Sequence, residues 1–395
     1  WAKRAAWHQI SDRPIEVTKS LSNDLVTLAF DKSQTEITRI LALWSLEGIR
    51  HYDKELINSL LASSEHDLRR EAVRSLASFS LDASEIASAL ENASEDSNPM
   101  VRSQVLRTLN EVGTANAETI NLLVKACKPE LGGNNMGGPY ERNFERFLAR
   151  KTLESYPEEL KMFIASPKAK QLNPSNILWA SQALEEKERD RVFLDLWTQK
   201  DVKIDLNEST FIIVANMLSN PTIFKAVRST LEQVEKAKTH VSYTLKNLAQ
   251  VQSSQLTQLL GKPVKSLLQN KDESTQRLGL EAVGKLHIKN LQNYIIPLIE
   301  ETSTAETLEL ILLALESQPE QNKKIFAQLS KNNNLEDEIR VSALHSLTKA
   351  DQSQAYTILK TWLPDLDETQ KKLITKDLSA SKKGALLLKQ LFEKE

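Results

Sequence analysis

The 395-residue chain is poor in cysteine and in the residues that interrupt helices. Its one cysteine, Cys127, excludes a disulfide framework, a cysteine-rich zinc site and a CxxCH haem attachment within this sequence. With only 10 glycines and 12 prolines, helices meet few interruptions. No run of about 18 apolar residues occurs, so the sequence predicts no membrane span.

Charge of either sign is not in excess. Lys and Arg together number 51, Asp and Glu 53, and the formal net charge is −2. A nucleic-acid-binding surface spread over the whole molecule would need a clear basic excess, so no nucleic-acid partner is expected. The sequence opens at Trp1 without a signal-peptide pattern, and we expect a processed product or a fragment of a longer protein.

What the chain does have is an internal repeat. An Arg followed three, four and seven positions later by apolar or small residues occurs at Arg39, Arg69, Arg102 and Arg340. That spacing is the buried stripe of an amphipathic helix. Weaker copies continue the series, which has its anchor positions at 39, 69, 102, 146, 177, 211, 244, 276, 308, 340 and 371. Most steps are close to about 32 residues, long enough for two helices and two turns.

One such helical pair cannot bury its apolar face alone, so neighbouring pairs must stack. The repeat therefore predicts an all-α fold, a right-handed α-solenoid of about 11–12 helical hairpins. First helices are expected over residues 53–61, 83–93, 117–126, 291–300 and 354–363. We predict N-terminal repeats over residues 1–130, a glycine-rich loop at 131–140, and C-terminal repeats over 141–395 that continue the first array.

The paired helices, the Asp/Asn-x-Val-Arg-like helix start and the small residue that follows resemble the HEAT-repeat family, an armadillo-like class of solenoid. The resemblance is good over residues 36–110 and 336–348. It is thin over 160–270, where only spacing and apolar phase support it.

Four segments follow a narrower pattern: 1–10, 40–48, 67–74 and 136–147. Together they resemble the HEAT-repeat segment of large exported bacterial proteins described as putative membrane-bound dehydrogenases. In that family the solenoid follows a quinoprotein-type β-propeller and precedes a c-type cytochrome domain. The resemblance implies a periplasmic or cell-surface location within a multidomain oxidoreductase. This sequence has no propeller, CxxCH or cofactor motif, so redox chemistry would lie outside it.

Sequence motifs for catalysis are missing. The six histidines form no HExxH and no i, i+4 pair, and no GxSxG, Walker-type or GxGxxG motif follows a strand. Acidic pairs lie at helix ends or in turns, where solvated charge is expected. Cys127 lies on the apolar face of a helix, which predicts a buried, inert thiol. We therefore predict no catalytic residue, no metal site and no cofactor.

One segment departs from the repeat. The loop 131–140 holds four of the ten glycines, which allow positive φ and expose backbone N–H groups. After it, arginines recur at i, i+4 and i+8, a helix stripe offset from Phe144, Phe147 and Leu148. The predicted partner-binding residues, which would grip a carboxylate-bearing segment or a neighbouring domain, are Asn134, Asn135, Tyr140, Arg142, Arg146 and Arg150. The alternative is a flexible loop whose arginines pair with Glu141, Glu145 and Glu154.

The leading functional hypothesis is a noncatalytic scaffold, because stacked helical pairs offer an extended surface suited to a protein partner or fused neighbouring domains rather than to a small molecule. Two alternatives stay open. One is an enzyme on a HEAT-like framework, of the DNA-glycosylase or bilin-lyase type. The other is a cytosolic trafficking or assembly adaptor, which would place the chain in the cytoplasm.

Overall fold

The computed structural model describes residues 2–199, 202, 204–251, 254–301 and 304–392. Within these ranges the secondary structure is helical, with short 3-10 turns and no β-strand. The chain divides into two compact units, unit 1 (Trp1–Thr210) and unit 2 (Phe211–Glu395). Each unit is a stack of paired helices, the α-solenoid that the 32-residue repeat predicts.

Unit 1 begins with two helices, α1 (Ala2–Ser11) and α2 (Ile15–Thr18), before the regular pairs start with α3 (Ser22–Phe30) and α4 (Glu36–Gly48). Its further elements are α5 (Lys54–Leu61), α6 (His66–Ser75), α7 (Ala83–Leu90), α8 (Pro99–Val112), α9 (Ala117–Ala126), α10 (Pro139–Leu153), α11 (Pro157–Ile164), α12 (Pro174–Ala180) and α13 (Glu186–Thr198). The division between the units falls within α14 (Glu208–Asn216). The predicted boundaries at residues 130 and 140 stay a prediction, and the glycine-rich loop lies inside unit 1.

Unit 2 has the same paired organisation. Its elements are α15 (Pro221–Leu231), α16 (Ala237–Lys246), α17 (Ser254–Leu268), α18 (Glu273–Leu286), α19 (Gln292–Ile295), α20 (Leu298–Glu301), α21 (Ala305–Leu315), α22 (Pro319–Lys331), α23 (Asp337–Ala350), α24 (Gln352–Trp362), α25 (Glu368–Ser379) and α26 (Lys382–Phe392). The single helix predicted over 291–300 is two short helices, because Pro297 has no N–H to donate and lies between them.

Polar caps set where the helices of unit 1 begin. The carboxylate of Asp53 accepts a hydrogen bond from the backbone N–H of Leu56, and Asp82 forms a capping box at the start of α7. Asn98 caps α8, in which Pro99 takes the first position. The predicted first helices at 53–61 and 117–126 are confirmed by α5 and α9 to within one residue, and the one expected over 83–93 ends three residues earlier, at Leu90.

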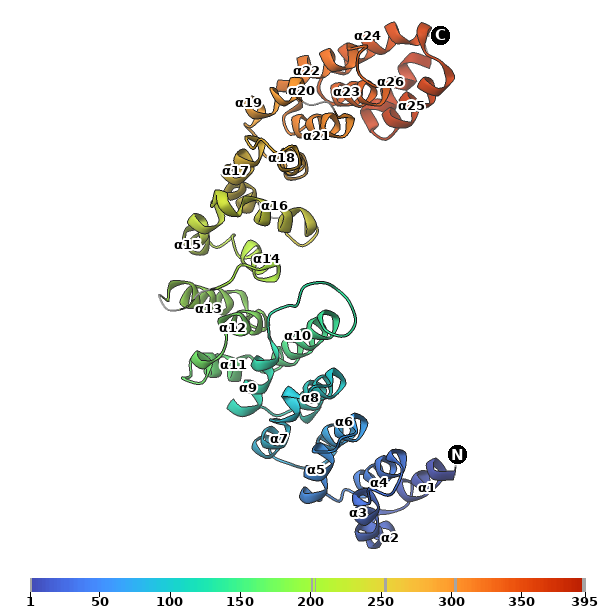
Figure 1. Cartoon of the computed structure of the whole chain (residues 1–395), viewed down its shortest axis with the longest axis vertical. Coiled ribbons are helices and arrows are strands. Elements are labelled where there is room, and N and C mark those ends of the chain that lie inside the picture. Colours follow the sequence, from blue (N-terminus) through green and yellow to red (C-terminus); the bar gives the residue numbers. More distant parts are fainter. Residues whose placement is uncertain (1, 200–201, 203, 252–253, 302–303, 393–395) are drawn as a thin grey trace. The chain divides into compact units, whose positions relative to one another are not determined.

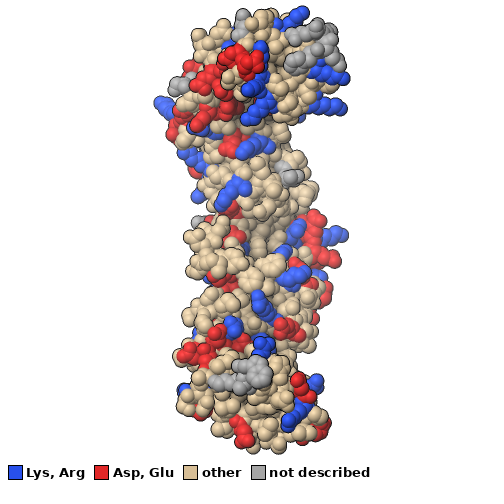
Figure 2. All heavy atoms as spheres, turned by 90° about the vertical axis from the view of Figure 1, so that its right-hand side faces the viewer, with Lys and Arg blue, Asp and Glu red and all other residues tan. Residues whose placement is uncertain are grey.

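The second helices of the pairs in unit 1 pack against one another in sequence, α4 on α6, α6 on α8 and α8 on α10. They lie along one side of the unit, and α5, α7, α9 and α11 lie along the other (Figure 1). Apolar side chains between the two rows, such as Leu43, Leu68 and Leu90, are fully buried. The lower part of Figure 2 shows the second-helix side of unit 1, where blue and red side chains are interspersed among larger uncharged areas.

The arginines that mark two consecutive repeats of unit 1, Arg69 and Arg102, have a structural role. Arg69 donates from Nη1 to the carbonyl oxygens of Ser63 and Ser64, which follow α5, and from Nε to the carboxylate of Asp96 at 2.6 Å. One repeat later, Arg102 donates to the carbonyl oxygen of Asp96 at 2.6 Å and to Glu145 at 3.0 Å. Each arginine therefore satisfies carbonyls at the end of its own first helix and binds an acidic residue of the next repeat.

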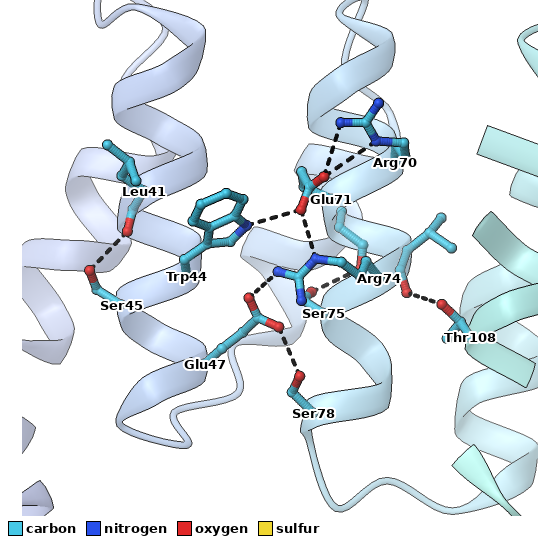
Figure 3. A network of polar contacts seen from close by, with 12 residues as sticks. Leu41, Trp44, Ser45, Glu47, Arg70, Glu71, Arg74, Ser75, Ser78 and Thr108 are labelled. Atoms are coloured by element: carbon cyan, nitrogen blue, oxygen red, sulfur yellow. Dashed lines mark hydrogen bonds and ion pairs between the residues drawn. The ribbon is translucent and has the colours of Figure 1, made fainter. Parts of the chain in front are cut away.

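A polar network also connects α4 with α6 (Figure 3). The carboxylate of Glu71 accepts hydrogen bonds from Trp44 Nε1 at 2.9 Å and from Arg74 Nε at 2.7 Å. Arg74 also forms an ion pair with Glu47, whose other oxygen accepts from Ser78 Oγ at 2.8 Å. The shared guanidinium holds one carboxylate from each of two adjacent repeats, so the network fixes how the two repeats stack.

Candidate functional site

The glycine-rich loop joins α9 to α10 and projects on the second-helix side of unit 1 (Figure 1). Gly133 and Gly137 have φ values of 92° and 89°, in the region that side chains disfavour. The side chains of Leu131, Asn134 and Asn135 are exposed. This part of the chain therefore presents itself to solvent rather than filling the core.

Two of the predicted arginines hold the beginning of this loop. Arg142 donates from Nη1 to the carbonyl oxygen of Pro129 at 2.9 Å. Arg146 Nη1 lies 3.0 Å from a carboxylate oxygen of Glu130. Both partners come directly before the glycine-rich stretch, so α10 fixes the point from which the loop departs.

The other end of the loop is held by Glu141. Its carboxylate accepts hydrogen bonds from the backbone N–H groups of Gly137, at 2.8 and 3.0 Å, and Gly138, at 2.7 Å. These backbone hydrogen bonds hold the pKa of Glu141 below its usual value. The N–H of Tyr140 donates to the carbonyl oxygen of Asn135 at 3.2 Å. The loop is thus tied at both ends to the first half of α10.

Arg146 lies in the interior. Its residue is 3% exposed, and its guanidinium carbon is 3.9 Å from the centroid of the Trp179 ring. Nη2 donates to the hydroxyl oxygen of Ser209 at 2.9 Å. Burial lowers the pKa of the guanidinium, although the attraction of Glu130 opposes that shift. The planar group stacks and makes directed hydrogen bonds at once, which a lysine could not do.

The pairing expected in the alternative hypothesis occurs at one arginine. Arg150 Nη1 lies 3.7 Å from the carboxylate of Glu154, one helical turn further on. Glu145 instead pairs with Arg102 of the preceding second helix, at 2.7 Å. Glu141 accepts from the backbone N–H groups of Gly137 and Gly138 instead.

The sequence hypothesis gave the arginines of α10 the outward role, and the structure brings out an aromatic stripe that it missed. Tyr140, Phe144 and Phe147 follow one another at i, i+4 and i+7, so they share a face of the helix. Tyr140 is exposed, and Phe147 is 48% exposed. Arg107 of α8 lies over the Phe144 ring, with its guanidinium carbon 5.8 Å from the centroid. The spacing of the three aromatic residues predicts that they share a helix face, but it does not predict whether that face is buried or exposed to solvent.

Cys127, just before the loop, is buried as predicted, with no exposed surface. Its thiol donates to the carbonyl oxygen of Leu123 at 3.4 Å. Burial raises the pKa of the thiol to about 12, despite the nearby charges of Arg146 and Arg150. The group is therefore protonated and shielded at neutral pH.

Within the described residues, no three His, Cys, Asp or Glu side chains gather closely enough to hold a metal ion. None of the helices in those ranges is long and apolar enough to cross a membrane. A depression of about 650 Å³ lies in unit 2 beside α18, α19 and α20, and its lining includes Asn270, Glu273, Gln276 and Tyr294. A depression of about 510 Å³ in unit 1 lies among the turns around Arg39 and Ser63.

These features define the class of protein: an all-α solenoid of HEAT-like helical hairpins. A family model described as HEAT repeats matches residues 54–130, which run from the start of α5 to the first residues after α9. Over residues 54–130 the chain is therefore similar to HEAT repeats, and the match agrees with the family resemblance of the sequence.

Among solved structures, the chain is similar to importin beta in an ammonium sulfate condition, with 12% identity, a TM-score of 0.45 and coverage of 92% of this chain and 57% of that one. It is similar to Kap95p bound to RanGDP, with 11% identity, a TM-score of 0.48 and coverages of 91% and 56%. It is also similar to the C-terminal fragment of the Chaetomium thermophilum cohesin loader SCC2, with 13% identity, a TM-score of 0.34 and coverage of 96% of this chain and 36% of that one. The chain thus spans little more than half the length of importin beta and of Kap95p, and about a third of the length of the cohesin-loader fragment. A comparison with curated proteins found no match.

Proposed function

We propose that this protein is a noncatalytic scaffold that binds a protein partner through one surface of unit 1. We call that surface the loop–α10 surface and define it by the exposed side chains of Leu131, Met136, Tyr140 and Phe147. The observation that carries the proposal is the combination of these apolar side chains with a backbone tied at both ends. Exposed apolar groups that are held in place mark interaction sites on soluble proteins.

The predicted site residues then divide by role. Asn134, Asn135 and Tyr140 are exposed and would contact the partner. Arg142 and Arg146 act as positioning residues, because they hold Pro129 and Glu130 at the base of the loop. Arg150, at the far end of the stripe, contacts Glu154 and would lie at the edge of the surface.

Site-specific photo-cross-linking in cells of the source organism tests this proposal. A photoreactive amino acid would replace Met136, which is 75% exposed in the loop, or Met162, which is 67% exposed on α11 on the other side of unit 1. The two positions match in residue type and exposure, so they differ only in surface. We expect a discrete cross-linked protein from position 136 and none from position 162. The same cross-links from both positions, or none from position 136, would contradict the proposal.

We further propose that the chain is part of a larger exported bacterial protein, with the solenoid acting as a spacer and docking segment for fused domains in the periplasm or at the cell surface. Supporting this, the segment from α2 to the end of α3, near the beginning of unit 1, has four exposed apolar side chains, Ile15, Val17, Leu21 and Phe30. A terminal solenoid repeat normally carries a polar outer face, so this apolar edge fits a neighbouring domain packed over it. Intact-mass analysis and peptide mapping of the natural protein test the proposal, and a natural product with no further domain would overturn it.

A further inference from the structure

We infer that the segment bound by the loop–α10 surface is a short, extended acidic peptide with an aromatic or aliphatic anchor. This inference rests on the proposed function and specifies the chemistry of the partner. It follows from which charges on the surface are already used within the fold and which are left for a partner.

The acidic groups of α10 are occupied by the protein itself. Glu145 is 5% exposed and pairs with Arg102, and Glu141 accepts from the backbone of Gly137 and Gly138. At the end of the helix, Glu154 pairs with Lys151. Cations of the fold therefore offset the charges of Glu145 and Glu154, and Glu141 keeps its negative charge with its oxygens bound to the backbone of the loop.

Two cations beside the stripe have no carboxylate partner among the described residues. Arg107 is exposed, and its guanidinium lies over the face of the Phe144 ring. Arg142 uses one of its guanidinium nitrogens for the carbonyl oxygen of Pro129. An arginine has five N–H donors, so both side chains retain donors that a carboxylate can accept from in a bidentate manner. The surface is therefore complementary to negative charge.

The apolar part of the surface sets the size of the ligand. Tyr140 and Phe147 are seven residues apart on one helix face, which is roughly 10 Å. That distance equals about three residues of extended chain, in which alternate side chains point the same way. One or two apolar side chains could pack between the aromatic stripe and Met136, while the acidic residues between them reach Arg107 and Arg142. Burying such an anchor beside a desolvated charge pair gives both affinity and register.

Selection from a phage-displayed library of random 12-residue peptides on the full chain tests the inference. We expect enriched peptides to carry Asp or Glu within two or three residues of Phe, Leu, Ile or Met. A synthetic peptide from that pool should bind Arg107→Ala about 10-fold more weakly than the unmodified protein, since one charge-assisted contact is lost. Arg191→Ala removes an exposed cation of α13 elsewhere in unit 1 and should leave the affinity unchanged. Phe147→Ser should abolish binding, and added salt should weaken it.

Each other outcome overturns the inference. Enriched peptides without acidic residues, peptides that bind Arg107→Ala as tightly as the unmodified protein, or a failure of selection would exclude the acidic class. A dimer of the chain that Phe147→Ser dissociates would assign the surface to a second copy of the protein. If photo-cross-linking at position 136 still captures a discrete protein in any of these cases, the scaffold function stands and only the ligand class is wrong.

Discussion

Replacing Arg146 by alanine should open the region around α9 and α10, because this arginine supports the fold rather than facing a partner. The substitution removes the stack on Trp179, the hydrogen bond to Ser209 and the attraction of Glu130 together. It leaves a cavity where the guanidinium was, under the base of the glycine-rich loop. Cys127 lies beside this site and is the chain's one cysteine, so its thiol reports the opening without further labels.

The expected cost follows from the contacts. A hydrogen bond from a charged donor is worth about 1.5–3 kcal/mol, and a desolvated cation–π contact about 2 kcal/mol. The ion pair adds at most about 1 kcal/mol, because Glu130 is partly exposed to solvent. Against these stands the cost of burying the charge, several kcal/mol, which the substitution removes. The net loss of stability is about 2–3 kcal/mol, within the range for a broken buried network.

Thiol labelling with a disulfide reagent at pH 8 measures this cost. When reclosing is fast, the labelling rate follows the equilibrium between closed and locally open forms. A loss of 2–3 kcal/mol therefore predicts labelling of Cys127 that is roughly 30- to 150-fold faster in Arg146→Ala. Arg146→Lys keeps the charge without the planar stack and should fall between the two. Arg191→Ala, with an exposed side chain on α13, is the matched control. Labelling of Arg146→Ala at the rate of the unmodified protein would refute the structural role.

Three further predictions concern other parts of the fold. Glu141→Gln should speed proteolysis within the loop at pH 7. In the unmodified protein the same effect should develop on acidification, since a depressed pKa gives stabilisation that is present above about pH 4.5 and is lost as the pH falls through the folded-state value. Glu71→Gln should destabilise unit 1 by about 2 kcal/mol in urea, because it weakens the hydrogen bonds from Arg74 and Trp44, whereas Glu47→Gln should cost less because burial raises the pKa of Glu47. Gly284→Ala should destabilise unit 2, because the added Cβ would lie 2.4 Å from Leu313 Cγ, and Leu313→Ala should rescue it.

Specific results would contradict each of these. For the loop, protease sensitivity that does not change between pH 7 and pH 3 would show that the Glu141 carboxylate does not hold it. For the α4–α6 network, equal urea midpoints for Glu71→Gln and Glu47→Gln would remove the distinction between the two glutamates. For unit 2, a Gly284→Ala protein as stable as the parent would show that α18 and α21 can move apart at no cost. Hydrogen exchange of the relevant helices should accompany each measurement, because a repeat protein need not unfold in one step.

The repeat itself could be predicted because its cause is local. In the clearest repeats an arginine near the start of the second helix is followed three, four and seven positions later by apolar or small residues, and this stripe requires a neighbour to cover it. Arg69 and Arg102 accordingly occupy equivalent places in successive repeats. The starts of the helices after Asp53 and Asn116 could be predicted because an N-cap residue acts on backbone groups only two or three residues away. Pro297 was visible as well, but the apolar pattern around it concealed the break in the helix.

The orientation of α10 was beyond the sequence. Its arginines and its aromatics both recur at helical spacing, so either stripe could have faced inward on periodicity alone. The orientation of α10 is decided by a pocket for Arg146 that residues far along the chain form. Trp179 provides a ring on which the guanidinium stacks, and Ser209 provides a hydrogen-bond acceptor. These groups make burial of Arg146 favourable and turn Phe147 outward. The sequence by itself determined the stacked helical pairs, because their contacts are periodic. Only the tertiary structure decided which face of α10 meets a partner, because the burial of a charge depends on partners that no local pattern encodes.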